Sequence, residues 1–249
     1  MGKGSLLGRV NTINRHVAFF FIVLCFYSSQ FLFLSIAAFP SPIRTDNPRE
    51  AALYRIRGLD YQSSGRLDLA IKAMQRSVEL DPSNAIGKIN LGWALHLAHR
   101  DNEARVVLEE VSKEHPRDIA ALNALGIVYL VTGELNKAVA THTKAITLDR
   151  SDEIAHYNLA LAYHLLGEYE SGIKEGLSAA KLEPNNPHPK LALSLNFWSK
   201  GDSYKSRFYY NCSISLDDRY RKSSYLLHLR EAAFSSLQID QLRQILKSL

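Results

Sequence analysis

The sequence contains little cysteine, and this scarcity excludes several kinds of protein. Cys25 and Cys212 are its two cysteines, too few for a disulfide-rich scaffold or a cysteine-based zinc site. The chain also lacks a glycine-rich phosphate loop, a nucleophile elbow and an HExxH motif. His96 and His99 have a spacing that suits metal ligands, but no cysteine or carboxylate completes the set at a recognisable spacing. The sequence therefore predicts a protein that is not an enzyme and has no metal and no cofactor.

A concentrated charge of one sign is also absent. Of the 30 basic residues, Lys3, Arg9 and Arg15 precede Pro40, in a stretch that has no acidic residue. The other 27 basic residues are balanced by 25 acidic ones. A nucleic-acid-binding protein needs a concentrated basic face, so the sequence predicts no nucleic-acid partner.

An uncharged apolar run near the N-terminus predicts contact with a membrane. A basic segment (1–16) is followed by residues 17–39, which contain no charge, and by a linker with three prolines, 40–50. At about 1.5 Å per residue, a helix over 17–39 crosses a hydrocarbon core of about 30 Å. The preceding basic residues place the N-terminus in the cytoplasm and the rest of the chain on the exoplasmic side, in a periplasm or a lumen. The alternative is a cleaved signal peptide, because Ser35-Ile36-Ala37 offers the small residues that a signal peptidase uses.

One unit recurs every 34 residues through most of the remaining chain. Small residues mark this period: Gly58, Gly92, Gly126, Ala160 and Ser194. Seven residues further into each unit stand Gly65, His99, Gly133, Gly167 and Gly201. A period that is kept through five units indicates a repeat protein.

Each unit has the pattern of two helices. In the fourth unit, apolar residues at helical spacing predict a first helix over 153–166 that ends at Gly167, and a second helix over 169–182 that ends before Pro184. Ala160 and Gly172 are small where the two helices come into contact. One such pair cannot bury its apolar stripes alone, so the units are expected to stack into a solenoid.

These residues resemble the tetratricopeptide repeat (TPR) family, whose pattern is W-x2-L-G-x2-Y followed by Ala, an aromatic residue and Pro over 34 residues. Leu125-Gly126-Ile127-Val128-Tyr129 matches the first half, and Ala104 with Leu108 and Pro116 matches the second half. The resemblance implies an all-α, right-handed solenoid of about five helix-turn-helix repeats. The apolar run described above adds one hydrophobic helix before it. The predicted repeats are 51–84, 85–118, 119–152, 153–186 and 187–220, with 221–249 as a degenerate repeat that caps the stack.

The resemblance also implies a concave groove, lined by the first helices, that binds a peptide or a partner protein. Aromatic and apolar side chains favour such binding because they bury a large area. An asparagine there can pair with an extended ligand or merely with a neighbouring helix, and any of these side chains can instead pack against the adjacent repeat. The predicted partner-binding residues are Ile89, Trp93, His96, Asn123, Ile127, Tyr157, Asn158, Leu161, Leu195, Asn196 and Trp198. The clamp for C-terminal carboxylates that some family members have is absent, because Leu59, Ala120 and Ala124 stand at its positions.

These features lead to one hypothesis and two alternatives. The hypothesis is a membrane-anchored scaffold or assembly adaptor that holds a partner segment in the groove, while the anchor raises the local concentration. The first alternative is a non-catalytic accessory subunit of a membrane enzyme complex. The second is a cleaved, soluble periplasmic or secreted binding protein.

Overall fold

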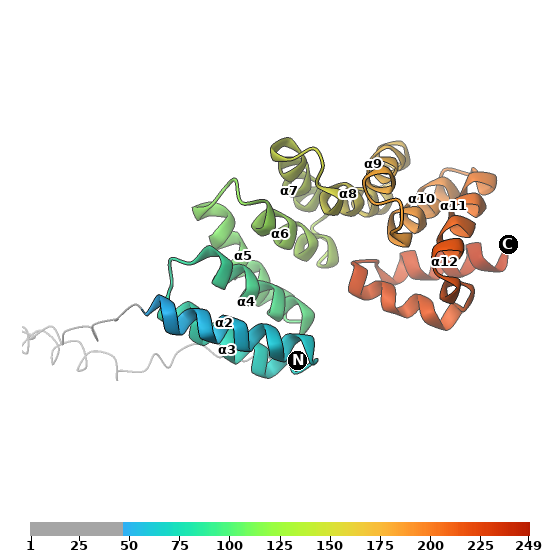
Figure 1. The fold of residues 1–249 in the computed structure, drawn as a ribbon. Coiled ribbons are helices and arrows are strands. Elements are labelled where there is room, and N and C mark those ends of the chain that lie inside the picture. The colour runs from blue at the N-terminus through green and yellow to red at the C-terminus, as the bar shows by residue number, and fades with distance from the viewer. Residues whose placement is uncertain (1–46) are drawn as a thin grey trace, which may run out of the picture. The chain divides into compact units, whose positions relative to one another are not determined.

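The computed structural model describes residues 47–249. The predicted basic segment (1–16), the predicted membrane-spanning or signal segment (17–39) and most of the linker lie outside the described residues. Within 47–249 the backbone forms eleven α-helices and two 3₁₀ helices, and no strand (Figure 1). No helix in this part of the chain is both long enough and apolar enough to span a bilayer.

Five helix pairs follow one another, and each pair lies within one predicted repeat except at the first helix. The pairs are α2 (Pro48–Ser63) with α3 (Leu67–Leu80), α4 (Ala85–Leu97) with α5 (Asp101–Glu114), α6 (Ile119–Val131) with α7 (Leu135–Leu148), α8 (Glu153–Leu166) with α9 (Tyr169–Leu182), and α10 (Pro187–Ser199) with α11 (Ser203–Leu216). The helices expected over 153–166 and 169–182 are confirmed by α8 and α9.

The first helix begins earlier than the repeat pattern indicates. Asn47 caps α2, because its side chain accepts a hydrogen bond from the backbone N–H of Glu50, and Pro48 suits the first helical position. The last three residues of the predicted linker, 48–50, therefore belong to the first helix.

The residue that separates the two helices of a unit has a left-handed backbone. Gly133, Gly167 and Gly201 have φ angles of 80°, 79° and 93°. His99 holds the same place in the second unit with a φ of 58°, a conformation that disfavours any side chain with a Cβ. The spacing of these residues in the sequence is thus explained by the turn that each unit needs.

The small residues that mark the period allow neighbouring helices to approach closely. A Cβ on Gly92 would lie 2.6 Å from Cγ of Leu108, which belongs to the second helix of the same unit. Gly172 has a different neighbour from the one expected, because its Cβ would lie 2.1 Å from the side-chain oxygen of Asn196 in the next unit. Small residues therefore serve contacts both within units and between them.

The first helices α2, α4, α6, α8 and α10 contact one another in order and form the inner side of the stack, whereas the second helices form the outer side (Figure 1). Each second helix also packs against the first helix of the next unit. One large apolar core therefore runs along the stack between the two layers, as expected for a solenoid.

The last part of the chain forms a degenerate helical pair after the five repeats, as predicted for 221–249. It consists of the 3₁₀ helices η1 (Asp218–Arg221) and η2 (Ser223–Ala232) and of α12 (Ser236–Lys247); we call residues 218–249 the C-terminal segment. Tyr220 does close the stack over α11, where its carbonyl accepts a hydrogen bond from the hydroxyl of Tyr210 at 3.2 Å. The rest of the segment does not extend the stack. It lies on the inner side, where the side-chain amide of Gln238 donates to the carbonyl of Leu161 on α8 at 3.1 Å (Figure 1).

Candidate partner-binding surface

The C-terminal segment divides the inner side of the stack into two parts. The covered part belongs to α8 and α10, against which α12 and the residues before it pack. The open part belongs to α2, α4 and α6, and we call it the open inner face. The predicted partner-binding residues are distributed over both parts.

Residues of the covered part are packing residues in this structure. Leu161 and Leu195 are fully buried, and the hydroxyl of Tyr157 donates a hydrogen bond to the carbonyl of Ala232. The ring of Tyr157 also lies 6.0 Å, between centroids, from the ring of Phe234. The chain's own C-terminal segment and core fill the space expected for a partner here, which is the packing alternative that the sequence left open; a partner-binding role for these residues stays a prediction. Trp198 is half-buried and packs against the same core.

The three predicted asparagines are also occupied by contacts within the chain. The amide of Asn196 donates to the carbonyls of Ala160 and Ala192 at 3.0 and 2.9 Å, and the amide of Asn123 donates to the carboxylate of Asp152 at 2.7 Å. Asn158 donates to the carbonyl of Ile154, one turn earlier in its own helix, at 3.0 Å. Of the two roles that the sequence allowed, internal pairing is the one that the structure shows.

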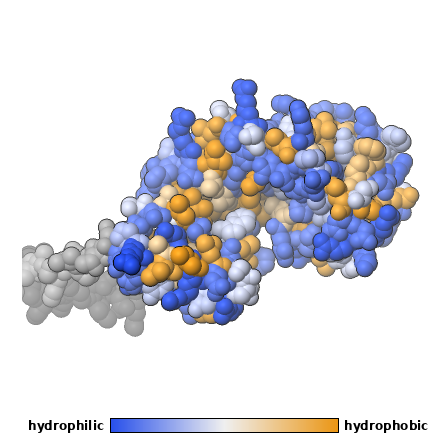
Figure 2. All heavy atoms as spheres, in the orientation of Figure 1, coloured by the Kyte–Doolittle hydropathy of each residue, from blue (hydrophilic) through white to orange (hydrophobic). Residues whose placement is uncertain are grey.

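The open inner face keeps large apolar side chains in contact with solvent. Ile86 is 61% exposed and Leu59 is 46% exposed, while Ile89, Trp93 and Ile127 are half-buried and rest on the core with one side. The apolar surface continues onto the outer edge of α2, where Figure 2 shows hydrophobic residues gathered. A group of exposed apolar side chains of this size on one face is typical of an interaction site.

His96 supports Trp93 rather than forming part of a metal site. Its ring centroid lies 5.1 Å from that of Trp93, and its Nδ1 atom lies 2.6 Å from a carboxylate oxygen of Asp101. The contact between His96 and Asp101 links the end of α4 to the start of α5. In the part of the chain that the structure describes, no three side chains of His, Cys, Asp or Glu come together in a way that could hold a metal ion.

A hollow of about 680 Å³ lies where the open inner face meets the C-terminal segment. Its walls come from the turn after α2, the ends of α4 and α6, and the stretch from η2 to the start of α12. The lining residues are Gly65, Leu67, His96, Leu97, His99, Asp101, Leu130, Val131, Leu227, Arg230, Glu231, Ala233, Phe234, Ser235 and Ser236. Its volume is that of a site for several side chains of a bound segment.

Histidines beneath the C-terminal segment are neutral at pH 7. Burial lowers the pKa of His164 to about 4, and the side chains of Ser199 and Gln238 lie within hydrogen-bond distance of its ring. Burial also lowers the pKa of His188 to about 4, with a further lowering from the nearby ring of His228. These two imidazoles therefore add no charge to the covered part at neutral pH, which avoids the cost of burying a charge.

The C-terminal side chains at this surface were not predicted from the sequence. Phe234, Gln238 and Leu227 lie outside the five regular repeats, so the period gives no position for them. A local signal was available at Ser235 and Gln238, which form a reciprocal capping box at the start of α12. That signal places the start of a helix but not the face on which the helix packs.

Family models match the repeats described above. One model for "TPR repeat" matches residues 129–167, and two models for "Tetratricopeptide repeat" match residues 61–128 and 154–186. The chain belongs to the tetratricopeptide repeat family. The TPR helix pairs, the glycine turns and the small contact residues are thus those of a known repeat.

Curated relatives share only part of their length with this TPR chain. The N-alpha-acetyltransferase 25, NatB auxiliary subunit of Rattus norvegicus is 26% identical over 140 residues, which is 56% of this chain and 14% of that protein. The protein CTR9 homolog of Arabidopsis thaliana is 28% identical over 138 residues, 53% of this chain and 13% of that protein. The chain therefore spans about a seventh of the length of these relatives.

Solved structures agree in fold. A crystal structure of MamA protein covers 68% of this chain and 93% of its own, with 21% identity and a TM-score of 0.58. TTC0263, a thermophilic TPR protein of Thermus thermophilus, covers 71% of this chain and 99% of its own, with 21% identity and a TM-score of 0.60. At this level of identity the similarity shows the TPR fold and no more.

Proposed function

We propose that this TPR protein is a non-catalytic interaction scaffold that binds a segment of a partner protein on the open inner face. The observation that carries the proposal is the group of solvent-exposed apolar side chains on α2 and α4, beside a hollow that the C-terminal segment bounds. Trp93 is the expected centre of this site, because a half-buried tryptophan offers a large area to a partner at a small entropic cost. The rigid stack holds these side chains in place before the partner arrives.

We further propose that residues 17–39 anchor the scaffold in a membrane, with the N-terminus in the cytoplasm and the repeats on the exoplasmic side. The uncharged length of this run and the three basic residues before it support the proposal. Mass spectrometry of the protein purified from its native source tests it. An intact N-terminus supports the anchor, whereas a mature N-terminus near Ala38 would show a cleaved signal and a soluble binding protein.

An accessory subunit of an enzyme complex is the second candidate function. Two observations favour it: the name of the rat relative is that of an auxiliary subunit, and this chain has no catalytic motif of the kinds named above. The accessory subunit predicts a single partner in fixed stoichiometry. The adaptor predicts several partners in smaller and variable amounts.

The experiment compares two variants with equally exposed side chains on opposite sides of the stack. Ile86 on α4 is 61% exposed at the open inner face, and Val106 on α5 is 62% exposed on the outer side. Neither Ile86→Asp nor Val106→Asp introduces a charge into the core, so both variants should fold. The full-length protein and both variants are purified from native membranes, and the retained proteins are quantified.

We expect the native chain and the Val106→Asp variant to retain the same partner, and the Ile86→Asp variant to lose it. Equal retention by both variants would show that binding does not use the open inner face. Far-UV circular dichroism of the three proteins confirms that any loss is not caused by unfolding.

A further inference from the structure

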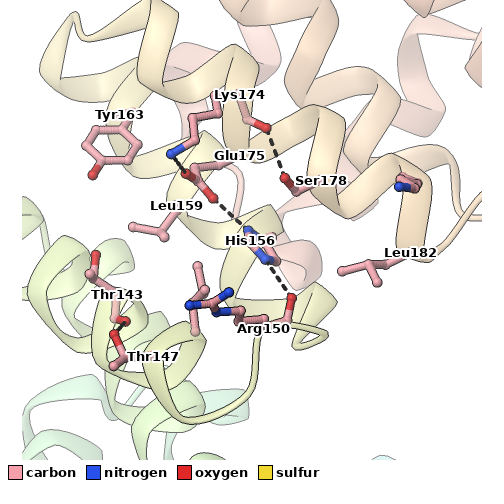
Figure 3. Close-up of a pocket in the computed structure, with 12 residues that line it drawn as sticks. Thr143, Thr147, Arg150, His156, Leu159, Tyr163, Lys174, Glu175, Ser178 and Leu182 are labelled. Carbon is pink, nitrogen blue, oxygen red and sulfur yellow. Dashed lines mark hydrogen bonds and ion pairs between the residues drawn. The ribbon is translucent and has the colours of Figure 1, made fainter.

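A second hollow lies on the outer side of the stack, away from the open inner face. It has a volume of about 640 Å³ and lies between α7 and α9, the second helices of units three and four. The residues of α8 that line it are His156, Leu159 and Tyr163. Figure 3 shows the side chains of the three helices around this space. We call it the outer groove.

The two sides of the outer groove carry hydroxyl groups and positive charges in rows. On one side, Thr143 and Thr147 are one helical turn apart, and Arg150 follows them in the turn after α7. On the other side, Ser178 and Lys181 are three residues apart on α9. From residue 143 to residue 150 the row is about 10 Å long at helical rise.

The positive charges of the outer groove are not balanced from within. Glu175 is the single acidic residue among those that line it. Its carboxylate is already paired, because Nδ1 of His156 lies 2.6 Å from it and Nζ of Lys174 lies 3.4 Å from it. Arg150 and Lys181, in contrast, form no ion pair with any residue from 47 to 249. Two cations therefore face this space without an acidic partner.

Two departures from the repeat pattern meet at the outer groove. Arg150 stands where units one, two and four have Pro82, Pro116 and Pro184. His156 stands where the family pattern has tryptophan, and its Nε2 atom lies 3.2 Å from the carbonyl oxygen of Arg150. The imidazole of His156 thus contacts the backbone of the turn that carries the side chain of Arg150. The arginine is not needed to form the helix pair, since units one, two and four form theirs with proline at this place.

The corresponding hollow between α5 and α7 differs in size and charge. Its volume is about 360 Å³, and its acidic residue Glu109 accepts a hydrogen bond from the hydroxyl of Tyr129 at 2.8 Å. No basic side chain among residues 47–249 forms an ion pair with Glu109. Lys113 and Lys144 also line that hollow, so it has two basic residues and one carboxylate, whereas the outer groove has three basic residues (Arg150, Lys174 and Lys181) and a carboxylate that is already paired.

We propose that the outer groove is a second binding site, for an acidic segment of a partner protein in extended conformation. A carboxylate of the segment pairs with Arg150 or Lys181, since neither cation has an acidic partner among residues 47–249. An apolar side chain of the segment rests on Ile146 and Leu159. The hydroxyl of Thr147 donates to the carbonyl of Thr143 at 2.9 Å, so its oxygen accepts a hydrogen bond from a backbone N–H of the segment. At about 3.3 Å per residue, the row of 10 Å accommodates about three extended residues. The rows run along two helices, which suits a segment better than a compact ion.

The test uses the full-length chain and a fluorescently labelled peptide in which Glu and Leu alternate over seven residues. A peptide of the same length in which Lys and Leu alternate is the charge control. Fluorescence anisotropy at low salt measures the affinity for the native chain and for three variants. The first is Arg150→Gln/Lys181→Gln, which removes both unpaired cations. The matched control is Lys72→Gln/Arg117→Gln, which removes two exposed cations elsewhere on the repeats and gives the same net charge.

We expect the Glu/Leu peptide to bind the native chain and the matched control alike, and to bind the Arg150→Gln/Lys181→Gln variant about fivefold more weakly. The Lys/Leu peptide should not bind measurably. The same affinity for both double variants would overturn the proposal, because binding would then follow net charge alone. The third variant, Ile86→Asp, should bind the Glu/Leu peptide as the native chain does. A loss in that variant would place the peptide on the open inner face and would also overturn the outer site.

The two proposed sites fail independently. Loss of partner retention in the Ile86→Asp variant concerns the open inner face, and the peptide titration of the Arg150→Gln/Lys181→Gln variant concerns the outer groove. If both sites are occupied, the scaffold contacts one segment on the inner side of units one to three and another on the outer side of units three and four.

Discussion

The buried imidazole of His142 makes the repeat stack less stable in mild acid. His142 is fully buried, and its ring lies against Gly126, where an added Cβ would be 2.5 Å from it. Burial lowers the pKa of His142 to about 3, from an ordinary value of 6.5. The unfolded chain therefore binds more protons than the folded chain between these two pH values. The free energy of unfolding falls as the pH is lowered from about 6.5 towards 3.

The size of this effect follows from the two pKa values. A pH of about 5 lies about 1.5 units below the pKa of the imidazole in the unfolded chain, so that imidazole is mostly protonated. The imidazole in the folded chain is still neutral at this pH. One pKa unit corresponds to about 1.36 kcal/mol, so His142 lowers the free energy of unfolding by about 2 kcal/mol at about pH 5 relative to neutral pH. His164 and His188 titrate in the same window and add to the total, but they are present in every variant compared below.

The substitution His142→Leu removes this titration and keeps the packing. Leucine is the residue at the same place in unit two, where Leu108 packs against Gly92 as His142 packs against Gly126. Urea unfolding, followed by circular dichroism at about pH 7.5 and about pH 5, gives the free energy of unfolding at each pH. The native chain should lose about 2 kcal/mol more than the variant between the two pH values.

The control is His115→Gln, which removes an imidazole that is exposed instead of buried. If the native chain and His142→Leu lose the same free energy between the two pH values, then the folded chain protonates His142 without penalty. That result would refute the reasoning from burial.

Three further substitutions test single contacts of the fold. Gly92→Ala should lower the free energy of unfolding by about 1–3 kcal/mol, because its Cβ would lie 2.6 Å from Leu108. Urea unfolding measures this loss. The loss should be smaller in a chain that also carries Leu108→Ala. His99→Gly should raise the free energy of unfolding by about 1 kcal/mol, because a φ of 58° strains a residue with a Cβ; a thermal melt with no increase would contradict it. Gln238→Ala should cost about 1–3 kcal/mol and speed amide exchange in α12, because the buried carbonyl of Leu161 loses a donor at 3.1 Å; unchanged exchange would show that this bond does not hold the C-terminal segment.

The regular part of the fold could be predicted because its signals are local. Gly167 ends α8 with a φ of 79°, and the apolar spacing before it places the helix to the residue. Gly92 and Gly126 must be small because each lies against a side chain of the second helix in its own unit. Repetition of these signals through five units made the stack predictable as well.

The candidate site could be predicted only in part, because exposure depends on residues far away in the sequence. Tyr157 and Leu161 occupy the same places in unit four as Asn123 and Ile127 in unit three, so the repeat pattern predicts the same exposure for both pairs. They differ in the structure because the carbonyl of Ala232, 75 residues further on, meets the hydroxyl of Tyr157. A local pattern has no means of expressing such a contact.

The sequence by itself determined the repeat, the two helices of the fourth unit and the absence of recognisable catalytic motifs, because each of these depends on residues within one unit or on composition. Only the tertiary structure decided which part of the inner side is free. The C-terminal segment carries apolar residues that must be buried, and it buries Leu226, Leu229 and Leu242 completely. It does so on the inner side, where α8 and α10 supply an apolar surface and the carbonyl of Leu161 supplies a partner for Gln238. The open inner face over α2, α4 and α6 is the part of the inner side that the C-terminal segment does not cover.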